Sequence, residues 1–546
     1  MAFRSSRPIL LDMISAKSTA TITGCCFILG LIRRLKPLLA ISPSSNAHRP
    51  AAIGDYFDFM PNALASLMLL LWPLVSLVLF RRLPLERAIL WCILAGYMIL
   101  PPVAEFDLPL VPDMDKFTIP SIMAFVLCVG LLRKKVPLLP RHPLAKVLTL
   151  LFVLAVIPTV MTNGDPVIFE VLADADPIVF ITDMLPGLRW RDLGSVMINQ
   201  VIILMPFLLA RRYLSSPEGQ KELLLAFCIA GLAYSIPSLF EIRFSPQINT
   251  TIYGFFQHDF SQTMRQGGFR PIVFMPHSLW LAVFMFSALL ATTALARAAQ
   301  EKRRLNLALA AAYLFVVLVL CKSFASLAYG LSFVPLVALA SPRWQIRVAI
   351  VLASIAITYP MLRNLDLFPT EAILAQAEAI SAERAQSLGY RFDNEAMMLG
   401  RAAEKPWFGW GGWGRNLVRE LETGAILSIP DGHWILVFGT LGWLGYLAEM
   451  GLLSLSIFLL GIEIHRRGTK EISPYATPIA LILAATMVDM MLNDTLVPMT
   501  WLCVGSVLGY AERLRYPGLF EARRPLFEGR QVLMPQPLSL KPPRHI

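Results

Sequence analysis

The sequence predicts an all-α polytopic membrane protein with about 12–14 transmembrane helices and one large extracytoplasmic helical loop. Its residues are 56% hydrophobic and only 16% charged, whereas soluble domains carry about a quarter charged residues. Apolar segments long enough to cross a bilayer recur along the chain, and the loops between them alternate in charge. These observations exclude a soluble enzyme.

The first apolar span begins at residue 60 and the last ends at residue 511. A helix needs about 20 apolar residues to cross the hydrocarbon core, and several candidates are shorter. The predicted spans are 60–80, 87–102, 117–132, 147–161, 193–210, 223–243, 271–296, 307–321, 327–341, 348–363, 438–464, 477–493 and 496–511.

The loops determine the orientation of these spans. One alternating set holds 20 Lys/Arg and 5 Asp/Glu, and the other set holds 12 Lys/Arg and 22 Asp/Glu. Because positive residues are retained in the cytoplasm, the first set is cytoplasmic. The basic loops are 81–87, 133–146, 211–222, 297–304, 341–347 and 465–476.

Charge and cysteine placement exclude further classes of protein. The net charge is +11, which in a soluble protein would suggest nucleic-acid binding, but the cytoplasmic loops account for it. We therefore expect no nucleic-acid partner. All seven cysteines lie in apolar stretches without metal-ligand or disulfide-framework spacing, so we expect buried thiols and no metal. They are Cys25, Cys26, Cys92, Cys128, Cys228, Cys321 and Cys503.

The chain divides into five parts. The topology of the first part is open, because Ala20–Ile32 is apolar but short and is followed by basic residues. It fits a signal-like segment, an interfacial helix or an extra span. The parts are an N-terminal segment (1–59), a helix bundle (60–363), the large loop (364–433), the C-terminal spans (434–511) and a basic, Pro-rich cytoplasmic tail (512–546).

The large loop is predicted to be helical. Residues 370–385 are rich in Ala, Glu and Gln and are typical of an amphipathic helix. A second helix is expected over Arg391–Ala403, ended by Lys405-Pro406. A Gly/Trp cluster follows at 409–416. A loop of this length can pack over a membrane cavity as a lid.

The polar chemistry of the sequence is concentrated on the outer side, and none of the usual nucleotide-binding, zinc-protease or paired CxxC motifs is present. Arg265 and Arg270 flank a Gly pair, and His277 follows. Arginine suits phosphate oxygens, and glycine lets the backbone approach a headgroup. The alternative is that these arginines anchor a helix at lipid headgroups by snorkelling.

Two further outer sites lie in the large loop. Arg391 has Asp393 and Glu395 close by, and by pattern alone a surface ion pair on a solvated helix is the favoured interpretation. His433 lies where the loop re-enters the membrane, and Asp431 is placed to orient it. A histidine there can act as a general base near neutral pH, although a lone interfacial histidine is more often structural.

Ionisable residues also occur at membrane depth. Glu241 lies at the outer end of its span, with Arg243 two residues further on. Asp489 lies close to Asn493 and Asp494. Such residues indicate function by default, but Asp489 equally suits a hydrogen bond between helices.

Taken together, these features resemble the O-antigen ligase and O-antigen polymerase superfamily of bacterial membrane glycosyltransferases. The resemblance covers about half of the chain, from Phe255 to the last span. It rests on many spans with one large outer loop before the last few helices, and on short motifs. These motifs are RQGGFRP around Arg265 and Arg270, KSFAS (322–326), Arg391 followed by PWFGWGGWG (406–414), and His433 followed by GWLG (442–445).

Three positions depart from the family pattern. Trp434 stands where Asn usually follows the histidine, Thr440 stands where Glu is common, and Pro276-His277 replaces a Pro-Asn pair. These departures affect the substrate more than the fold.

The resemblance implies a function at the periplasmic face of the bacterial inner membrane. A glycan on an undecaprenyl diphosphate donor would pass to a glycan or to a lipid A core acceptor. Arg265, Arg270 and Arg391 would bind the diphosphate, and His433, held by Asp431, would be the general base. His277 and Arg415 are further candidates. No metal or other cofactor is implied, and the partners are the lipid-linked donor, the acceptor, the bilayer and other polysaccharide assembly proteins.

Two further choices remain open from the sequence. A polymerase is slightly favoured over a ligase, because the His-Asn pair common in ligases is broken at Trp434. A transporter or flippase and a non-catalytic scaffold of a polysaccharide complex are the alternatives to an enzyme, although no internal repeat typical of transporters is evident.

Overall fold

The computed structural model describes residues 61–107, 111–173, 179–265, 267–420, 424–469 and 471–517. The predicted segment 1–59 lies outside these residues, as does the tail from residue 518 onward. Our interpretations of both stay predictions.

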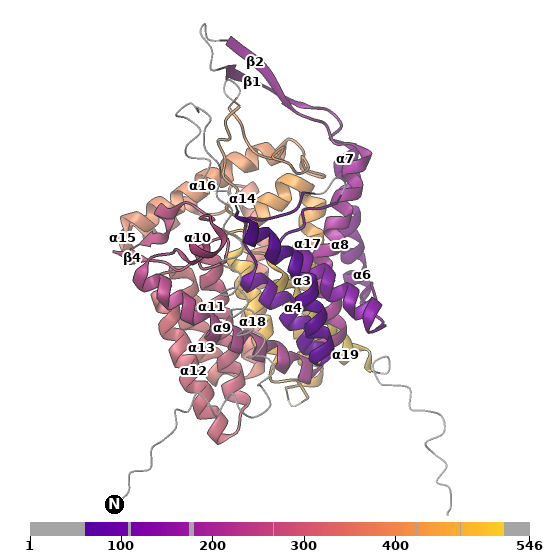
Figure 1. Ribbon diagram of the computed structural model, residues 1–546, viewed down its shortest axis with the longest axis vertical. Coiled ribbons are helices and arrows are strands. Elements are labelled where there is room, and N and C mark those ends of the chain that lie inside the picture. Colours follow the sequence, from indigo (N-terminus) through magenta and orange to yellow (C-terminus); the bar gives the residue numbers. More distant parts are fainter. Residues whose placement is uncertain are drawn as a thin grey trace, which may run out of the picture.

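The described chain forms a bundle of long helices that run roughly side by side (Figure 1). The bundle helices are α3 (Ala63–Arg82), α4 (Leu85–Ile99), α5 (Thr118–Val126) continued by the π-helix η3 (Leu127–Leu131), α6 (Pro143–Leu154), α7 (Val156–Met161), α8 (Trp190–Tyr213), α9 (Pro217–Phe244), α11 (Ser278–Ala298), α12 (Glu301–Leu320), α13 (Phe324–Leu339), α14 (Pro342–Asn364), α17 (His433–Arg467), α18 (Ala476–Asp489) and α19 (Pro498–Arg515).

These helices confirm the predicted fold class. Each predicted span overlaps one of them or a consecutive pair. Within the described ranges, 8 helices are long and apolar enough to cross a membrane, and three shorter apolar helices accompany them. Large apolar side chains also face outward along α3, where Leu70, Leu74 and Val78 are more than half exposed. Their four-residue spacing forms one apolar stripe that lipid must cover, so the chain is a multi-pass membrane protein.

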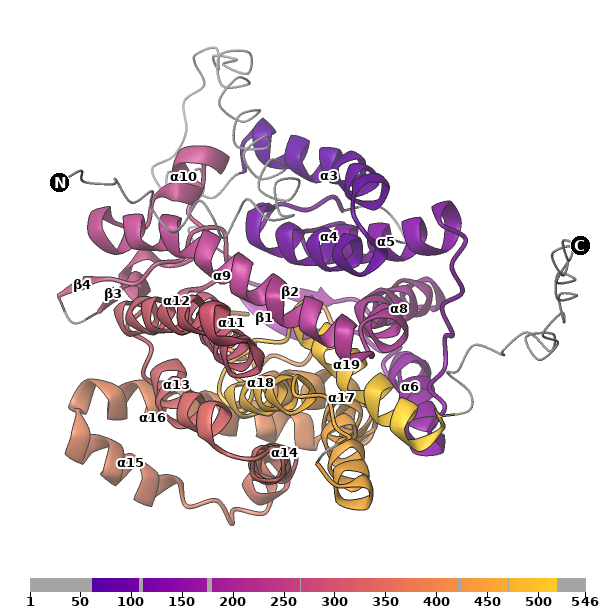
Figure 2. The same cartoon turned by 90° about the horizontal axis from the view of Figure 1, so that it is seen from below.

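The core lies where α11 and α18 pass through the middle of the bundle. In Figure 2, α18 is surrounded by α11, α14, α17 and α19, and the first helices α3–α5 lie at one edge. The five described cysteines are all buried with free thiols, as predicted. Small residues allow close packing; for example, Gly231 of α9 lies against Ala288 of α11.

The predicted span 438–464 is not one straight helix. Helix α17 starts at His433 and breaks at Gly442, which has a φ of 64°. Backbone groups freed at the break are satisfied by the Gly/Trp cluster: Trp443 N donates to Pro406 O (2.8 Å), and Gly411 N donates to Thr440 O (2.9 Å). A broken helix at this depth is tolerated because its backbone pairs with protein rather than facing lipid.

The end of the bundle next to the large loop carries the remaining elements (Figure 1). The large loop contains α15 (Thr370–Ile380) and α16 (Ala382–Ala403). The predicted helix 370–385 is therefore shorter than expected, because the chain is extended at Ser381 and turns α16 back against α15. Arg391 consequently lies in the middle of α16 rather than at a helix start.

Short strands also occur on this side, which we did not predict. β1 (Val167–Ala173) and β2 (Val179–Leu185) form an antiparallel hairpin that projects from the bundle in Figure 1. After α10 (Ile248–Tyr253) and the 3-10 turn η4 (Phe260–Thr263), β3 (Met264–Arg265) pairs with β4 (Gly268–Phe269). The β3–β4 hairpin carries the first predicted arginine site.

Candidate functional site

The three predicted arginines converge, although they are far apart in sequence. Arg265 ends β3, Arg270 follows β4, and Arg391 lies on α16. Burial and the nearby charges of Arg265 and Arg391 lower the pKa of Arg270 to about 10. The three arginines are therefore close enough to one another to interact electrostatically.

Arg270 is the most unusual member of this cluster. It is 3% exposed, and its Nε and Nη2 atoms have no hydrogen-bond partner among the described residues. A buried guanidinium without a partner is costly, because it has lost its hydration. Other cations surround it, so the pocket favours an anion as the missing partner.

Lys322 is a fourth cation at this site, and the sequence analysis did not single it out. Its Nζ donates to the carbonyl oxygen of Arg265 at 2.9 Å. The residue has a φ of 53°, which is uncommon outside glycine. This strained conformation at the turn between α12 and α13 directs the ammonium group toward the β3–β4 hairpin.

The segment from Arg270 to His277 is irregular, and side chains from three elements hold its backbone. Glu241 of α9 accepts hydrogen bonds from Ile272 N (2.8 Å) and Val273 N (2.7 Å). The Nε2 of Gln257 donates to the carbonyl oxygens of Val273 and Met275. Glu241 is therefore a structural support for the arginine site, which explains its position at the outer end of its span.

Lys116 also holds the backbone of the segment from Arg270 to His277. Its Nζ donates to Phe274 O at 2.6 Å, and the residue is 1% exposed. Burial lowers the pKa of Lys116 to about 7, although Asp115 opposes this shift. Tyr234 completes the support, since its hydroxyl accepts from Phe274 N at 3.0 Å.

Arg391 is positioned by a buried ion pair one helical turn further along α16. Glu395 pairs with Arg363 at the end of α14 and accepts from the Tyr359 hydroxyl at 2.9 Å. Trp434 donates its Nε1–H to the same carboxylate at 3.4 Å. Glu395 is therefore buried and pairs with Arg363, not with Arg391 at the surface. Trp434 therefore has a structural contact of its own.

Asp431 faces Arg391 rather than His433. The Arg391 Nε lies 3.8 Å from Asp431 Oδ2, and about a third of the Asp431 side chain is exposed. Burial raises the pKa of Asp431, while Arg391 and His258 lower it. A half-buried carboxylate beside the arginines can take a proton from a substrate hydroxyl.

His433 has both of its ring nitrogens occupied by other carboxylates. Nδ1 lies 2.7 Å from Asp494 Oδ1, and Nε2 contacts Glu449 Oε1. The ring is 7% exposed. The expected orienting contact with Asp431 is thus replaced by Asp494 and Glu449, because α17 folds back at Gly442. Both ring nitrogens are therefore engaged by protein side chains in this arrangement.

Arg415 is also committed to structural contacts. Its guanidinium donates to the backbone carbonyls of Trp410 (3.2 Å), Pro186 (2.8 Å) and Asp165 (2.9 Å). It ties the base of the β1–β2 hairpin to the Gly/Trp cluster. All three of its nitrogens are used, so the structure gives no support to Arg415 as a diphosphate ligand.

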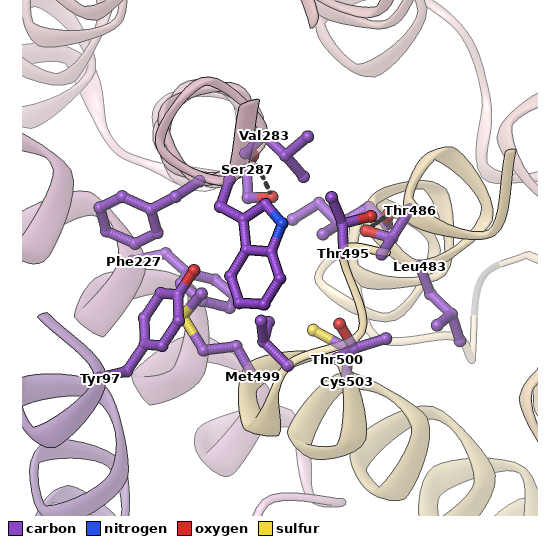
Figure 3. Close-up of a pocket in the computed structure, with 14 residues that line it drawn as sticks. Tyr97, Phe227, Val283, Ser287, Leu483, Thr486, Thr495, Met499, Thr500 and Cys503 are labelled. Carbon is purple, nitrogen blue, oxygen red and sulfur yellow. Dashed lines mark hydrogen bonds between the residues drawn. The ribbon is translucent and has the colours of Figure 1, made fainter. Parts of the chain in front are cut away.

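An apolar cavity lies within the bundle beside the outer site. The cavity has a volume of about 30 Å³. Figure 3 shows the side chains from α4, α9, α11, α18 and α19 that line it. Thr495 lines it and donates to Asp489 Oδ2 at 2.9 Å. Asp489 is thereby fixed at the outer end of the cavity, where Arg391 acts on it electrostatically.

Sequence reasoning missed several residues of this site: Lys322, Lys116, Gln257, His258 and Glu449. Glu449 and Lys116 had a usable signal, because charged residues within or next to apolar spans indicate specific partners. The residues that the structure describes contain no group of three or more His, Cys, Asp or Glu side chains arranged to hold a metal ion.

Comparison with known proteins adds no relative to this description. No protein-family model matches the sequence, and no curated protein matches it.

Proposed function

We propose that this chain is a membrane glycosyltransferase of the O-antigen ligase and polymerase type. The buried Arg270 carries the proposal, because its unpartnered N–H groups lie among Arg265, Arg391 and Lys322. Four cations around one position suit a diphosphate, whose oxygens accept bidentate hydrogen bonds from arginine. The donor is a glycan on a polyprenyl diphosphate, whose apolar tail stays in the bilayer.

In the proposed reaction, the bond between the sugar's anomeric carbon and the phosphate oxygen breaks. The hydroxyl oxygen of the acceptor sugar bonds to that carbon, and its proton passes to the carboxylate of Asp431. The leaving diphosphate gains negative charge, which Arg270, Arg265 and Arg391 stabilise. His433 holds the outer end of α17, and therefore Asp431, in place. A polymerase remains favoured over a ligase.

The test measures both chemistry and glycan length. Purified protein in lipid nanodiscs is given a polyprenyl-diphosphate-linked glycan and an acceptor, and released polyprenyl diphosphate is quantified. We expect wild type to release it and Arg270→Ala and Asp431→Asn to lose at least about a hundredfold in rate. In a strain lacking the gene, the same variants at matched membrane level should leave surface glycan short or unattached.

A lipid-linked substrate transporter is the second candidate, and the broken helix α17 favours it, since discontinuous helices are common in transporters. A transporter would move the lipid-linked glycan between leaflets without releasing polyprenyl diphosphate. Translocation in sealed vesicles without product release would replace our proposal with this one. A scaffold would show neither activity.

A further inference from the structure

Two histidines from separate segments contact each other beside the arginine cluster. His258 lies in the loop after α10, and His277 caps the N-terminus of α11. Their ring centroids are 4.4 Å apart with an interplanar angle of 67°. Neither the diphosphate contacts nor the proton transfer proposed above uses this pair.

The hydrogen bonds define which nitrogen of each ring carries the proton. His258 Nδ1 accepts from Asp259 N at 2.7 Å, and His277 Nδ1 accepts from Leu279 N at 3.0 Å. A nitrogen that accepts a hydrogen bond carries no proton, so each ring is neutral with its proton on Nε2. The tautomer assignment therefore follows from backbone donors on both sides.

The two Nε2–H groups differ in their partners. That of His277 donates to Gln262 Oε1 at 3.3 Å. That of His258 has no hydrogen-bond partner within the described part of the chain. Burial, His258 and the arginines lower the pKa of His277 to about 3, so His277 stays neutral and serves as a fixed support for His258.

His258 lies close to Asp431 and to the arginine cluster. It is half-buried. A charge on its ring would lower the pKa of Asp431, Asp259 and His277, so these three groups lie near it. Arg270, Arg265 and Arg391 act on His277 as well, so the charged groups facing the pair are the three arginines, Asp431 and Asp259. His277 bonds to Gln262 of η4, and Arg270 N donates to Thr263 O of the same turn at 2.7 Å, so the histidine pair lies beside the hairpin that carries Arg270.

We propose that His258 is a substrate-binding residue that donates its Nε2–H, as a neutral imidazole, to an oxygen of the bound diphosphate. This inference rests on the proposed function, because the ligand is the diphosphate of that site. A neutral donor adds a directed hydrogen bond without increasing the repulsion among four cations. His277 is the positioning residue that holds the ring of His258 through their edge contact.

The experiment measures binding of inorganic pyrophosphate to the full-length protein in detergent at pH 6 and pH 8. The variants are His258→Ala, His258→Gln and Arg270→Ala. We expect His258→Ala to weaken binding about tenfold and His258→Gln, whose Nε2–H₂ occupies a similar position, to recover most of that loss. The ratio of each variant to wild type should be the same at both pH values, because the donor is neutral.

Each other outcome identifies what has failed. If Arg270→Ala weakens binding but His258→Ala does not, His258 makes no contact and only this inference is overturned. If His258→Ala weakens binding at pH 6 but not at pH 8, His258 binds as a cation and the neutral-donor inference is wrong. If Arg270→Ala leaves binding unchanged, the anion site and the proposed function fail together. Thermal unfolding of each variant checks that it is folded. If His258→Ala does not fold, the binding test uses His258→Gln instead.

Discussion

His433 and Glu449 lie in contact, although they are separated by 16 residues of the same helix. In a straight α-helix this separation spans about 24 Å along the axis. The contact exists because α17 reverses at Gly442, where the positive φ places the first segment back against the second. Asp494, from the loop between α18 and α19, closes the cluster on the other side of the ring.

Gly442→Ala should destabilise the protein. A Cβ at this position would overlap the backbone of Trp407, and φ is in the left-handed region. We expect a loss of about 2–4 kcal/mol, seen as a lower unfolding temperature in detergent. Gly400→Ala is the matched control, because its Cβ would meet nothing within 4 Å on α16. Equal unfolding temperatures for both variants would show that the reversal at Gly442 is not required.

His433→Ala should lower stability as well as activity. Removing the ring leaves the buried carboxylate of Glu449 without its partner, and breaking a buried pair costs about 3–5 kcal/mol. His433→Leu combined with Glu449→Leu should recover part of that loss, because no unpaired charge remains. Thermal unfolding of the single and double variants measures this. A His433→Ala protein of wild-type stability without activity would return His433 to the role of general base.

Arg270→Met should stabilise the protein while abolishing activity. The guanidinium of Arg270 is buried near other cations, and two of its N–H groups have no partner among the described residues. An apolar side chain of similar length removes the free-energy cost of burying this charge. We expect a higher unfolding temperature and no glycosyl transfer. Pyrophosphate should raise the unfolding temperature of wild type but not of this variant. A destabilised Arg270→Met protein would show that Arg270 stabilises the fold and does not form an anion site.

Arginine-to-lysine changes should separate the roles of Arg391 and Arg415 in the large loop. Arg391→Lys cannot reproduce bidentate phosphate contact, so activity should fall at least about tenfold with little change in stability. Arg415→Lys loses most of its three carbonyl contacts, so stability should fall by about 1–3 kcal/mol. Pyrophosphate affinity of folded Arg415→Lys should stay at the wild-type value. If Arg391→Lys lowered stability and Arg415→Lys lowered activity and pyrophosphate affinity, the two assignments would have to be exchanged.

Lys116 should make stability depend on pH. Its folded pKa is about 7, while a lysine in the unfolded chain titrates near 10.4. Between these values the unfolded state binds a proton that the folded state lacks, so stability rises with pH from about 7 to 10. Compared with Lys116→Met, wild type should become relatively more stable over this range. A constant difference between the two unfolding temperatures would show that Lys116 does not titrate there.

Much of this architecture was predictable because membrane insertion imposes local rules. Apolar length and loop charge were sufficient to predict the helices from α3 to α19, since each span must satisfy its own backbone in lipid. The family resemblance also implied a common role for Arg265, Arg270 and Arg391, which stays a prediction. The β1–β2 hairpin was missed, because short strands outside the membrane leave only a weak alternating pattern.

The sequence by itself determined the membrane class, the positions of the spans and the chemical character of the outer site. Only the tertiary structure decided which partner each charged group has: Asp431 for Arg391, Asp494 and Glu449 for His433, and backbone carbonyls for Arg415. The physical reason is that hydropathy acts locally along the chain. Ion pairs between distant segments depend on where the helices pack and where α17 turns back.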